Sequence, residues 1–208
     1  MPDIRCFLLV PTTRVRRELC RYSAADKRDC PLRGGWCHNA LAPLDVIDEP
    51  DRRKCVCGDL WPHDDPRWPV ACQCGYAFTP ADHWQLFCST LYRRSDNGEE
   101  TTLSDAPDGA MWYADWMTHN RDASDHRYFG PDGRCLVCRV PKRHDWMIDG
   151  PASNCTKPDD KAHKCWVRHG EPPLITVDKN GDTCNAGAGS ILTPDWHGFL
   201  RNGVLTTG

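Results

Sequence analysis

Apolar positions near the start of the chain follow two patterns that predict two different elements. The run Ile4–Val10 is almost continuously apolar and Pro11 follows it, so it predicts a short buried strand. In the next segment, Val15, Leu19 and Tyr22 fall at helical spacing, and arginines occupy the other positions around the turn. This second pattern predicts an amphipathic helical element with a solvated basic face.

The segment 76–94 carries the signals of the main helix that the sequence predicts. Thr79 can cap a helix, Pro80 suits the first helical position, and Asp82 suits the first turn. Apolar residues then recur at helical spacing and form one stripe. The residues of this stripe are Trp84, Phe87 and Leu91.

The second half of the chain alternates turn signals with short apolar stretches. The turn Gly130–Gly133 precedes a stretch rich in Val and Leu, which predicts a strand. The pairs Asn180-Gly181 and Asn202-Gly203 suit tight hairpins, because Asn and Gly tolerate a positive φ. This part of the chain therefore predicts a compact antiparallel sheet.

Together, these patterns predict an α+β, β-rich fold. Residues 1–117 would form an N-terminal lobe with one main helix. Residues 118–128, which are polar, would form a linker or surface loop. Residues 129–208 would form an antiparallel, hairpin-rich C-terminal lobe.

Composition changes this picture chiefly through cysteine. The 208 residues include 14 Cys, nine Trp and 17 Pro, and the mean hydropathy is -0.64, as in a turn-rich protein with a modest apolar supply. We expect no signal peptide, since the opening residues lack a long apolar core and a small-residue cleavage site. No run approaches the roughly 18 apolar residues of a membrane span. A reducing compartment then favours metal ligation over disulfides.

Two Cys-x-Cys-Gly units are the strongest metal signal in the chain. They contain Cys55 with Cys57 and Cys72 with Cys74, and they predict a zinc-stabilised N-terminal lobe. A disulfide inside Cys-x-Cys would be strained, which favours zinc. Spacing does not decide which cysteines share an ion, and two further residues are rival ligands. These rivals are Cys30 and His38.

A second zinc site is expected in the C-terminal lobe. Cys155, Cys165 and Cys184 would join one histidine, with His163, His169 and His197 as the candidates. The alternative is that these cysteines are independent core thiols, because the spacings between them are long. For the pair Cys135 and Cys138, two packed thiols are the favoured interpretation, since residues three apart point to opposite faces of a strand.

No sequence motif points to a catalytic residue. The segments His63–Asp65 and His144-Asp145 suggest acid–base chemistry, but the chain lacks an H-E-x-x-H or similar motif, so exposed loop charges are the favoured interpretation. The net charge of -3 argues mildly against nucleic-acid binding. A basic patch that grips phosphates is the alternative, and its residues would be Arg14, Arg16, Arg17 and Arg21.

Several long segments resemble a family of uncharacterised proteins from phages of actinobacteria. The matching segments are IRCFLLVPTTRVRRELCRYS, DDPRWPVACQCGYAFTPADHWQLF, LYRRSDNGEETTLSDAPDGAMWYADWM, GPDGRCLVCRVP, DGPASNCTKPDDKAHKCWVRHGEPPLITVDKNGDTCNAGAGSI and WHGFLRNGVLT. The resemblance implies a phage origin and a place in the host bacterial cytoplasm or the virion. It implies no activity, and it marks the Cys72/Cys74 unit as the more typical knuckle.

The sequence therefore predicts a non-enzymatic, zinc-stabilised phage protein that acts as an interaction module or as a minor capsid- or tail-associated component of the virion. Its partners would be phage or host proteins. The alternatives are a metal-dependent hydrolase or nuclease, which would need an open metal site, and a nucleic-acid-binding regulator that uses the basic patch.

Overall fold

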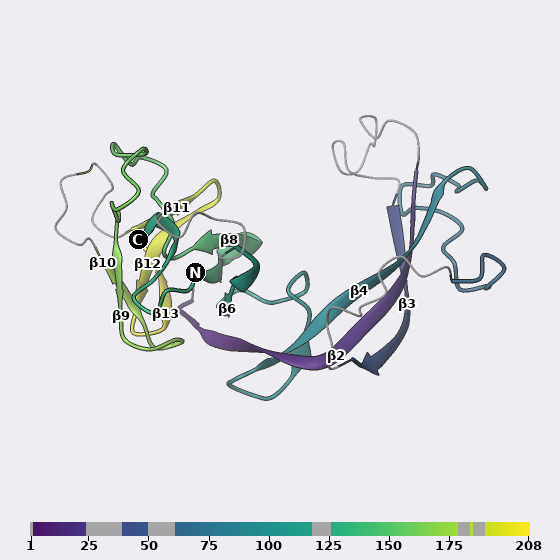
Figure 1. Cartoon of the computed structure of the whole chain (residues 1–208), viewed down its shortest axis with the longest axis horizontal. Helices are drawn as coiled ribbons and strands as arrows, with labels where there is room; N and C mark the ends of the chain where they lie inside the picture. Colours follow the sequence, from purple (N-terminus) through teal and green to yellow (C-terminus); the bar gives the residue numbers. More distant parts are fainter. Residues whose placement is uncertain (1, 24–38, 50–60, 118–125, 179–183, 185–189) are drawn as a thin grey trace. The chain divides into compact units, whose positions relative to one another are not determined.

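The computed structural model describes the chain except for residues 1, 24–38, 50–60, 118–125, 179–183 and 185–189 (Figure 1). The chain divides into two compact units. Unit 1 comprises Met1–Val10 and Arg93–Gly208, and unit 2 comprises Pro11–Tyr92. Strands β2 (Phe7–Tyr22) and β4 (His83–Arg94) each contribute residues to both units.

The predicted main helix is wrong, and with it the α+β class. Strands make up 47% of the described residues, and none of these residues lies in a helix of seven residues or more. The segment that was expected to be helical is β4. The described part of the chain is therefore a β fold with short 3₁₀ turns.

In the first half of β4, alternate side chains contact the core, as in a strand. Trp84, Leu86 and Cys88, at every second position, all contact the apolar cluster of unit 2, in which Leu19 and Trp68 are buried. Phe87, which the helical stripe would have buried, is 42% exposed. Pairing with other strands thus decides the conformation over the local helical signal.

The residues expected to cap the helix build a turn instead. The backbone N–H and the hydroxyl of Thr79 both donate hydrogen bonds to one carboxylate oxygen of Asp82, at 2.7 and 3.1 Å. This is the local side-chain-to-backbone bonding that also caps helices, so the two motifs share a sequence signature. Asp82 lies in the turn that leads directly into β4.

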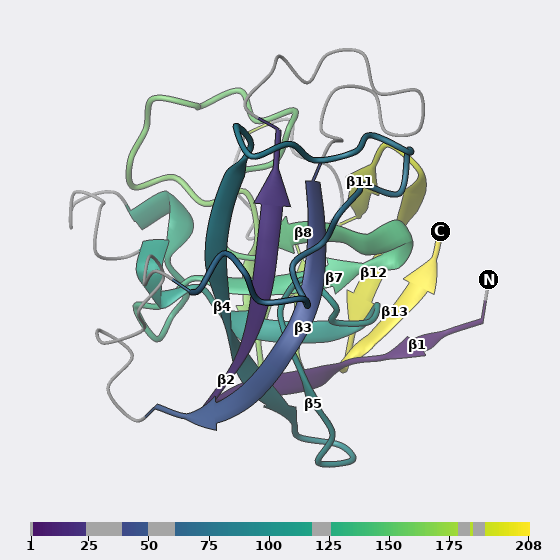
Figure 2. The ribbon, with the colours of Figure 1, turned by 90° about the vertical axis from the view of Figure 1, so that its right-hand side faces the viewer.

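The segment expected to be an amphipathic helix is also a strand, because β2 continues through Pro11 to Tyr22. Its partner in unit 2 is β3 (Asn39–Asp48), which pairs antiparallel with a register shift between Arg17 and Glu18. Val15 and Leu19 are four residues apart and both buried, a spacing that fits a strand as well as a helix. Figure 2 shows β2 between β3 and β4.

The described part of unit 1 contains the remaining strands and three single 3₁₀ turns. The strands are β1 (Ile4–Arg5), β5 (Glu100–Thr101), β6 (Ala110–Tyr113), β7 (Leu136–Val140), β8 (His144–Met147), β9 (Val167–His169), β10 (Thr176–Asp178), β11 (Ile191–Thr193), β12 (Trp196–Arg201) and β13 (Val204–Thr207). The 3₁₀ turns are η3 (Asp115–Met117), η4 (His126–Tyr128) and η5 (Pro141–Arg143).

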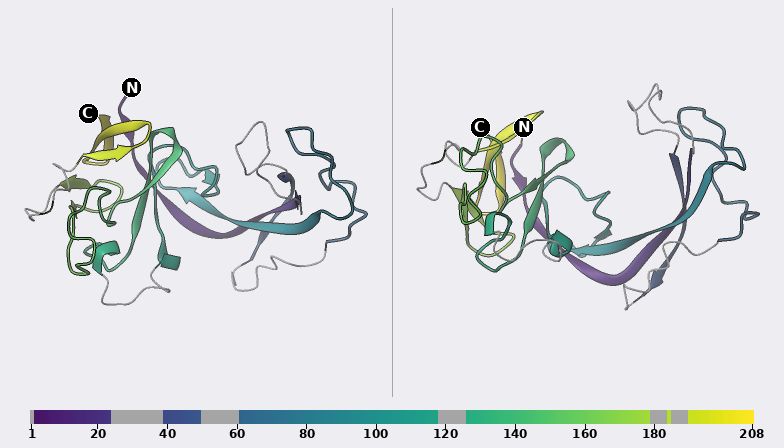
Figure 3. Two further views of the ribbon diagram at one scale, coloured as in Figure 1. Left: turned by 90° about the horizontal axis from the view of Figure 1, so that it is seen from above. Right: turned by 45° about the horizontal axis from the view of Figure 1, so that its top comes forward.

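Antiparallel pairing dominates unit 1. One sheet has the order β1-β13-β12-β11, β9 pairs with β10, and β6, β7 and β8 form consecutive antiparallel pairs. The hairpin β12–β13 turns at Asn202 and Gly203, whose φ values are +46° and +71°, as the Asn-Gly signal predicts. This hairpin is yellow in both views of Figure 3. The other predicted Asn-Gly turn, at residues 180–181, lies outside the described residues.

The core of unit 1 is one apolar cluster. Its most buried members include Leu136, Ile175, Ile191 and Leu200, and it extends to several cysteines. Burial of side chains of this size stabilises a unit by about 1.5–3 kcal/mol each relative to exposure. The cluster thereby fixes the strand ends from which the loops of the candidate site depart.

Candidate metal centre

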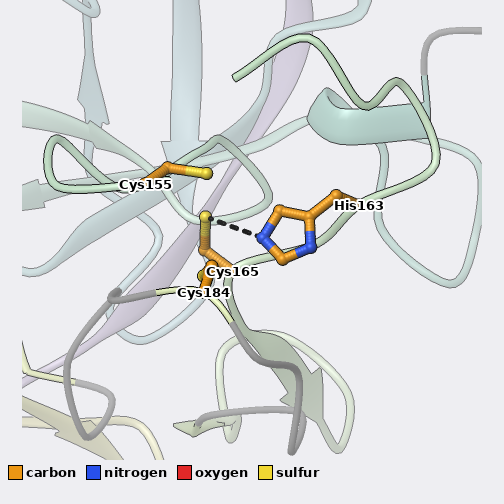
Figure 4. A group of neighbouring side chains, drawn as sticks. All are labelled: Cys155, His163, Cys165 and Cys184. Atoms are coloured by element: carbon orange, nitrogen blue, oxygen red, sulfur yellow. Dashed lines mark hydrogen bonds between the residues drawn. The ribbon is translucent and has the colours of Figure 1, made fainter. Parts of the chain in front are cut away.

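Two loops of unit 1 bring together four metal-binding side chains. Cys155 lies between β8 and β9, His163 and Cys165 lie just before β9, and Cys184 follows β10 (Figure 4). The sequence analysis named all four as candidates for a second site. The fold therefore joins positions that are up to 29 residues apart in the chain.

Successive turns fold the loop between Cys155 and His163 back on itself. The N–H of Cys155 donates to the carbonyl of Ala152, and the N–H of His163 donates to the carbonyl of Asp160, both at 3.1 Å. A carboxylate oxygen of Asp160 also accepts from the N–H of Ala162 at 3.0 Å. The loop contains Pro158, Asp159 and Asp160, and the fixed φ of Pro and the local bonding of Asp favour such turns.

The spacing of the four donor atoms suits a single ion. The three Sγ atoms and one imidazole nitrogen all lie within 4.8 Å of one another. The Sγ of Cys165 is 3.7 Å from the Nε2 of His163. Four ligands placed tetrahedrally at zinc bond lengths are about 3.5–3.8 Å apart, so the group needs only a small contraction around an ion.

Burial and backbone contacts also suit thiolate ligands. His163, Cys165 and Cys184 are at most 4% exposed, and Cys155 is half-buried. Backbone N–H groups reach two of the sulfurs: Ala152 donates to Cys165 at 3.2 Å and Lys157 donates to Cys155 at 3.3 Å. Such bonds favour the charged form of a sulfur ligand.

Without a cation, the Cys165 thiol resists ionisation. Burial, with smaller contributions from the neighbouring thiols Cys155 and Cys184, raises the pKa of Cys165 to about 12 despite the opposing hydrogen bond from the N–H of Ala152. A bound metal ion would reverse this balance, because its charge stabilises thiolates directly. Metal binding at this group would accordingly release protons.

The donor set has the composition of a closed site. Three cysteines and one histidine supply four protein ligands, the number that a structural zinc site uses. Thiolate and imidazole donors also favour zinc over calcium or magnesium, which prefer oxygen. With these four donors in place, the group can hold an ion but leaves no coordination position for a water or a substrate.

The Cys72/Cys74 unit forms the turn that its glycine predicts. The N–H of Cys72 donates to the carbonyl of Tyr76 at 2.8 Å, and the N–H of Gly75 donates to the carbonyl of Cys72 at 2.9 Å. Gly75 has a φ of +89°, which other residues rarely adopt. Within the described residues, these two cysteines do not belong to a larger metal-binding group.

The residues predicted to share a metal ion with Cys72 and Cys74 lie outside the described residues. Cys30, His38, Cys55 and Cys57 all fall in the ranges 24–38 and 50–60. The predicted site of the N-terminal lobe therefore stays a prediction. The described half supplies two cysteines on one tight turn, with Cys72 buried and Cys74 half-buried.

The two alternative histidines of the second site lie elsewhere. His169 is exposed on β9 and its Nε2 is 2.9 Å from Asp178, whereas His197 is exposed on β12. Cys135 and Cys138 are both fully buried and face different neighbours. Cys135 contacts the sulfur of Met117, and a hydrogen bond with the Cys6 thiol, together with burial, raises the pKa of Cys138.

The histidine–aspartate segments are engaged in structural contacts. His63 stacks on Trp84 with ring centroids 4.7 Å apart, and the carboxylate of Asp65 accepts hydrogen bonds from Trp61 and Arg67. The second segment, His144-Asp145, makes two side-chain contacts. His144 lies 3.2 Å from Asp195, and Asp145 accepts from Arg139 at 2.8 and 3.1 Å.

Arg168 belongs to an ionic network that the sequence did not predict. Arg168 donates to Asp149 at 2.9 Å and to Asp132 at 2.5 Å, and Tyr113 donates to Asp132 at 3.0 Å. Burial raises the pKa of Asp149 against the attraction of Arg168. No spacing in the sequence signals this network, since its members come from four separate segments.

Comparisons with known proteins identify no relative of this chain. No protein-family model matches the chain, and searches of curated proteins and of solved structures find no significant match. The resemblance to the actinobacteriophage family thus stays a prediction. Among the described residues, no helix has the length and apolar character needed to cross a membrane.

Proposed function

We propose that this protein is a non-enzymatic, zinc-stabilised interaction module, in which Cys155, His163, Cys165 and Cys184 hold one zinc ion. The observation that supports it is the convergence of these four donor atoms within 4.8 Å in the core of unit 1. In this role the metal cross-links the loop between β8 and β9 to the loop that follows β10. Zinc binding then contributes folding free energy directly.

Zinc is the metal that the donor set favours. Three sulfurs and one nitrogen match the Cys₃His class of structural sites, and zinc imposes no redox chemistry on its thiolates. A four-ligand site argues against the alternative of a metal-dependent hydrolase or nuclease, which needs an open coordination position. The structural contacts of His63, Asp65, His144 and Asp145 also argue against the hydrolase or nuclease alternative.

The nucleic-acid alternative has little support from the basic patch. Arg17 makes a bidentate ion pair with Asp45, and Arg21 is 5% exposed and donates to backbone carbonyls. Both side chains are thus engaged within unit 2 rather than offered to phosphates. In the setting that the resemblance implies, the partners are phage or host proteins, and the module acts in the host cytoplasm or in the virion.

Elemental analysis of single variants tests the zinc proposal. The Cys165→Ser variant should lose one zinc ion per chain relative to the original protein, and Cys155→Ser should do the same. Cys88→Ser, a half-buried cysteine of unit 2, is the matched control and should retain the full zinc content. An equal zinc content in Cys165→Ser and Cys88→Ser would overturn the proposed site.

The interaction role needs a separate experiment. Affinity capture from infected host cells, with the zinc-loaded protein as bait, should recover a phage or host protein, and purified virions should contain the chain if it is a virion component. Absence from virions together with no captured partner would contradict the interaction role. Zinc-dependent cleavage of DNA, lost in Cys165→Ser, would favour the enzymatic alternative instead.

A further inference from the structure

Unit 1 has an open pocket directly beside the candidate metal centre. Its volume is about 620 Å³, within the range of small-molecule sites. Two tryptophans, one exposed leucine, one histidine and several small polar residues line it. The lining residues that carry the argument are Trp146, Ser153, Asn154, Trp166, Leu192 and His197.

The pocket shares its wall with the metal centre. The segment Pro151–Asn154 lines the pocket and leads directly into Cys155, while Trp166 follows Cys165 in sequence. Ala152, within that wall, donates its backbone N–H to the Sγ of Cys165 at 3.2 Å. An ion that fixes Cys155 and Cys165 would therefore also fix two sides of the pocket.

The lining restricts the charge of an occupant. Among the described residues that line the pocket there is no Asp, Glu, Lys or Arg. A phosphate or carboxylate group would find no Lys or Arg to pair with, and an ammonium group no carboxylate. Ser153, Asn154 and Ser190 instead offer hydroxyl and amide groups, which bond neutral polar groups in either direction.

The tryptophans restrict the shape of an occupant. The rings of Trp146 and Trp166 have centroids 5.6 Å apart and planes inclined at 73°. A flat nucleobase gains most between parallel aromatic planes, and this pair does not provide them. Inclined rings form an apolar corner, which suits a thicker, puckered ring that has one apolar face and polar groups along its edge.

From this combination we infer that the pocket binds a neutral saccharide. An apolar face of a sugar ring packs against the tryptophan corner, and its hydroxyls bond to the amide of Asn154 and to the serine hydroxyls. One sugar ring is much smaller than the pocket, so a disaccharide or longer glycan fits it better. The dependence of this binding on zinc rests on the proposed function, whereas the pocket itself does not.

Titration of the full-length, zinc-supplemented protein tests the inference. The probes are methyl glucoside, methyl galactoside, N-acetylglucosamine and their neutral disaccharides, with uncharged nucleosides as a second series. Tryptophan fluorescence and saturation-transfer NMR report binding. At least one saccharide should bind with a Kd below about 10 mM, and disaccharides should bind more tightly than monosaccharides.

Paired variants locate the binding. Leu192, at the pocket, and Leu174, outside it, are both exposed leucines of unit 1, with exposed fractions of 70% and 60%. Leu192→Arg should weaken saccharide binding at least tenfold, whereas Leu174→Arg should leave it unchanged. Trp146→Ala should also weaken binding at least tenfold, and Trp116→Ala, at an exposed tryptophan of η3, should not.

Three outcomes would overturn the inference: no saccharide binds in this range, a nucleoside binds more tightly than every saccharide, or binding survives Leu192→Arg. Removal of zinc by a chelator should weaken binding at least tenfold. If binding persists after zinc is removed, the pocket stands and its coupling to the metal fails. If Cys165→Ser retains full zinc content while the saccharide still binds, the proposed function fails and the pocket assignment stands.

Discussion

Unit 1 contains a metal-binding group that the described part of unit 2 lacks. In unit 1, four donor atoms meet in the apolar core, where a metal ion would join the two loops that supply them. In the described part of unit 2, strands are held by an arginine stacked on aromatic rings: the guanidinium of Arg21 lies 3.7 Å from the ring centre of Trp84 and 5.0 Å from that of Phe78.

This difference predicts which change should destabilise each unit. The four donor side chains of unit 1 cross-link their two loops only when a cation joins them. Stacked arginines and paired strands need no added group, because the cation is part of the chain. Unit 1 should therefore depend on metal more strongly than the described strands of unit 2 do.

Chelation should produce the largest effect. Removal of metal by a strong chelator should abolish hydrogen-exchange protection at Cys165, Trp166 and Val177 in unit 1, since zinc binding contributes about 10–16 kcal/mol in small zinc domains. Amides of the β2–β3 ladder, such as Leu19, should keep most of their protection. Hydrogen exchange followed by mass spectrometry measures both. Equal loss in the two units would show that unit 2 also depends on metal and would break the comparison.

Arg168→Ala should destabilise unit 1 by about 3–5 kcal/mol, because it leaves Asp149 buried without its partner. The side chains of both residues are at most 5% exposed. The control is Arg134→Ala, whose ion pair with Asp115 is about half exposed and should contribute at most about 1 kcal/mol. Urea unfolding measures the two changes. A similar decrease in the free energy of unfolding in both variants would mean that the buried Arg168–Asp149 pair stabilises unit 1 no more than the exposed pair does.

Arg21→Ala should destabilise unit 2 by about 2–3 kcal/mol. It removes hydrogen bonds to the carbonyls of Pro69 and Thr79 and the stacking on Trp84. Arg67→Ala, at an exposed arginine near the Trp61 ring, is the control and should destabilise the protein much less than Arg21→Ala does. The measurement is urea unfolding at fixed zinc concentration. If Arg21→Ala costs no more than the control, the stacked arginine does not hold this unit.

The Arg17–Asp45 pair should give the smallest effect and a defined pH dependence. The hydrogen bond from Arg17 lowers the pKa of Asp45 below its ordinary value. A carboxylate with a lowered pKa contributes stability that is present above its unfolded pKa, about 3.9, and is lost as pH falls through the lower folded pKa. Because Asp45 is 40% exposed, Asp45→Asn should cost less than about 1 kcal/mol at pH 7.

Thermal melts from pH 7 to pH 2 measure this dependence. The difference between the original protein and Asp45→Asn should shrink at acid pH. Asp48→Asn, at the exposed end of β3, is the control and should show a smaller difference at pH 7. A difference that grows on acidification would contradict the assigned direction of the Asp45 pKa.

Residue chemistry alone determined a good part of this protein. The types Cys155, His163, Cys165 and Cys184 were recognisable as metal donors, and the Asn202-Gly203 turn was recognisable as a hairpin, because both depend on properties of the residues themselves. The tight turn at Gly75 follows from the same kind of local argument.

Only the tertiary structure decided the rest. Trp84 and Leu91 suit a helix locally, yet β4 pairs within a sheet, and the favourable long-range contacts outweigh the local preference. Likewise, the choice of His163 over His169 or His197, and the meeting of Arg168 with Asp149, depend on how separate loops fold back on one core. Sequence spacing carries no record of such distances, because a chain that turns many times can bring almost any two loops together.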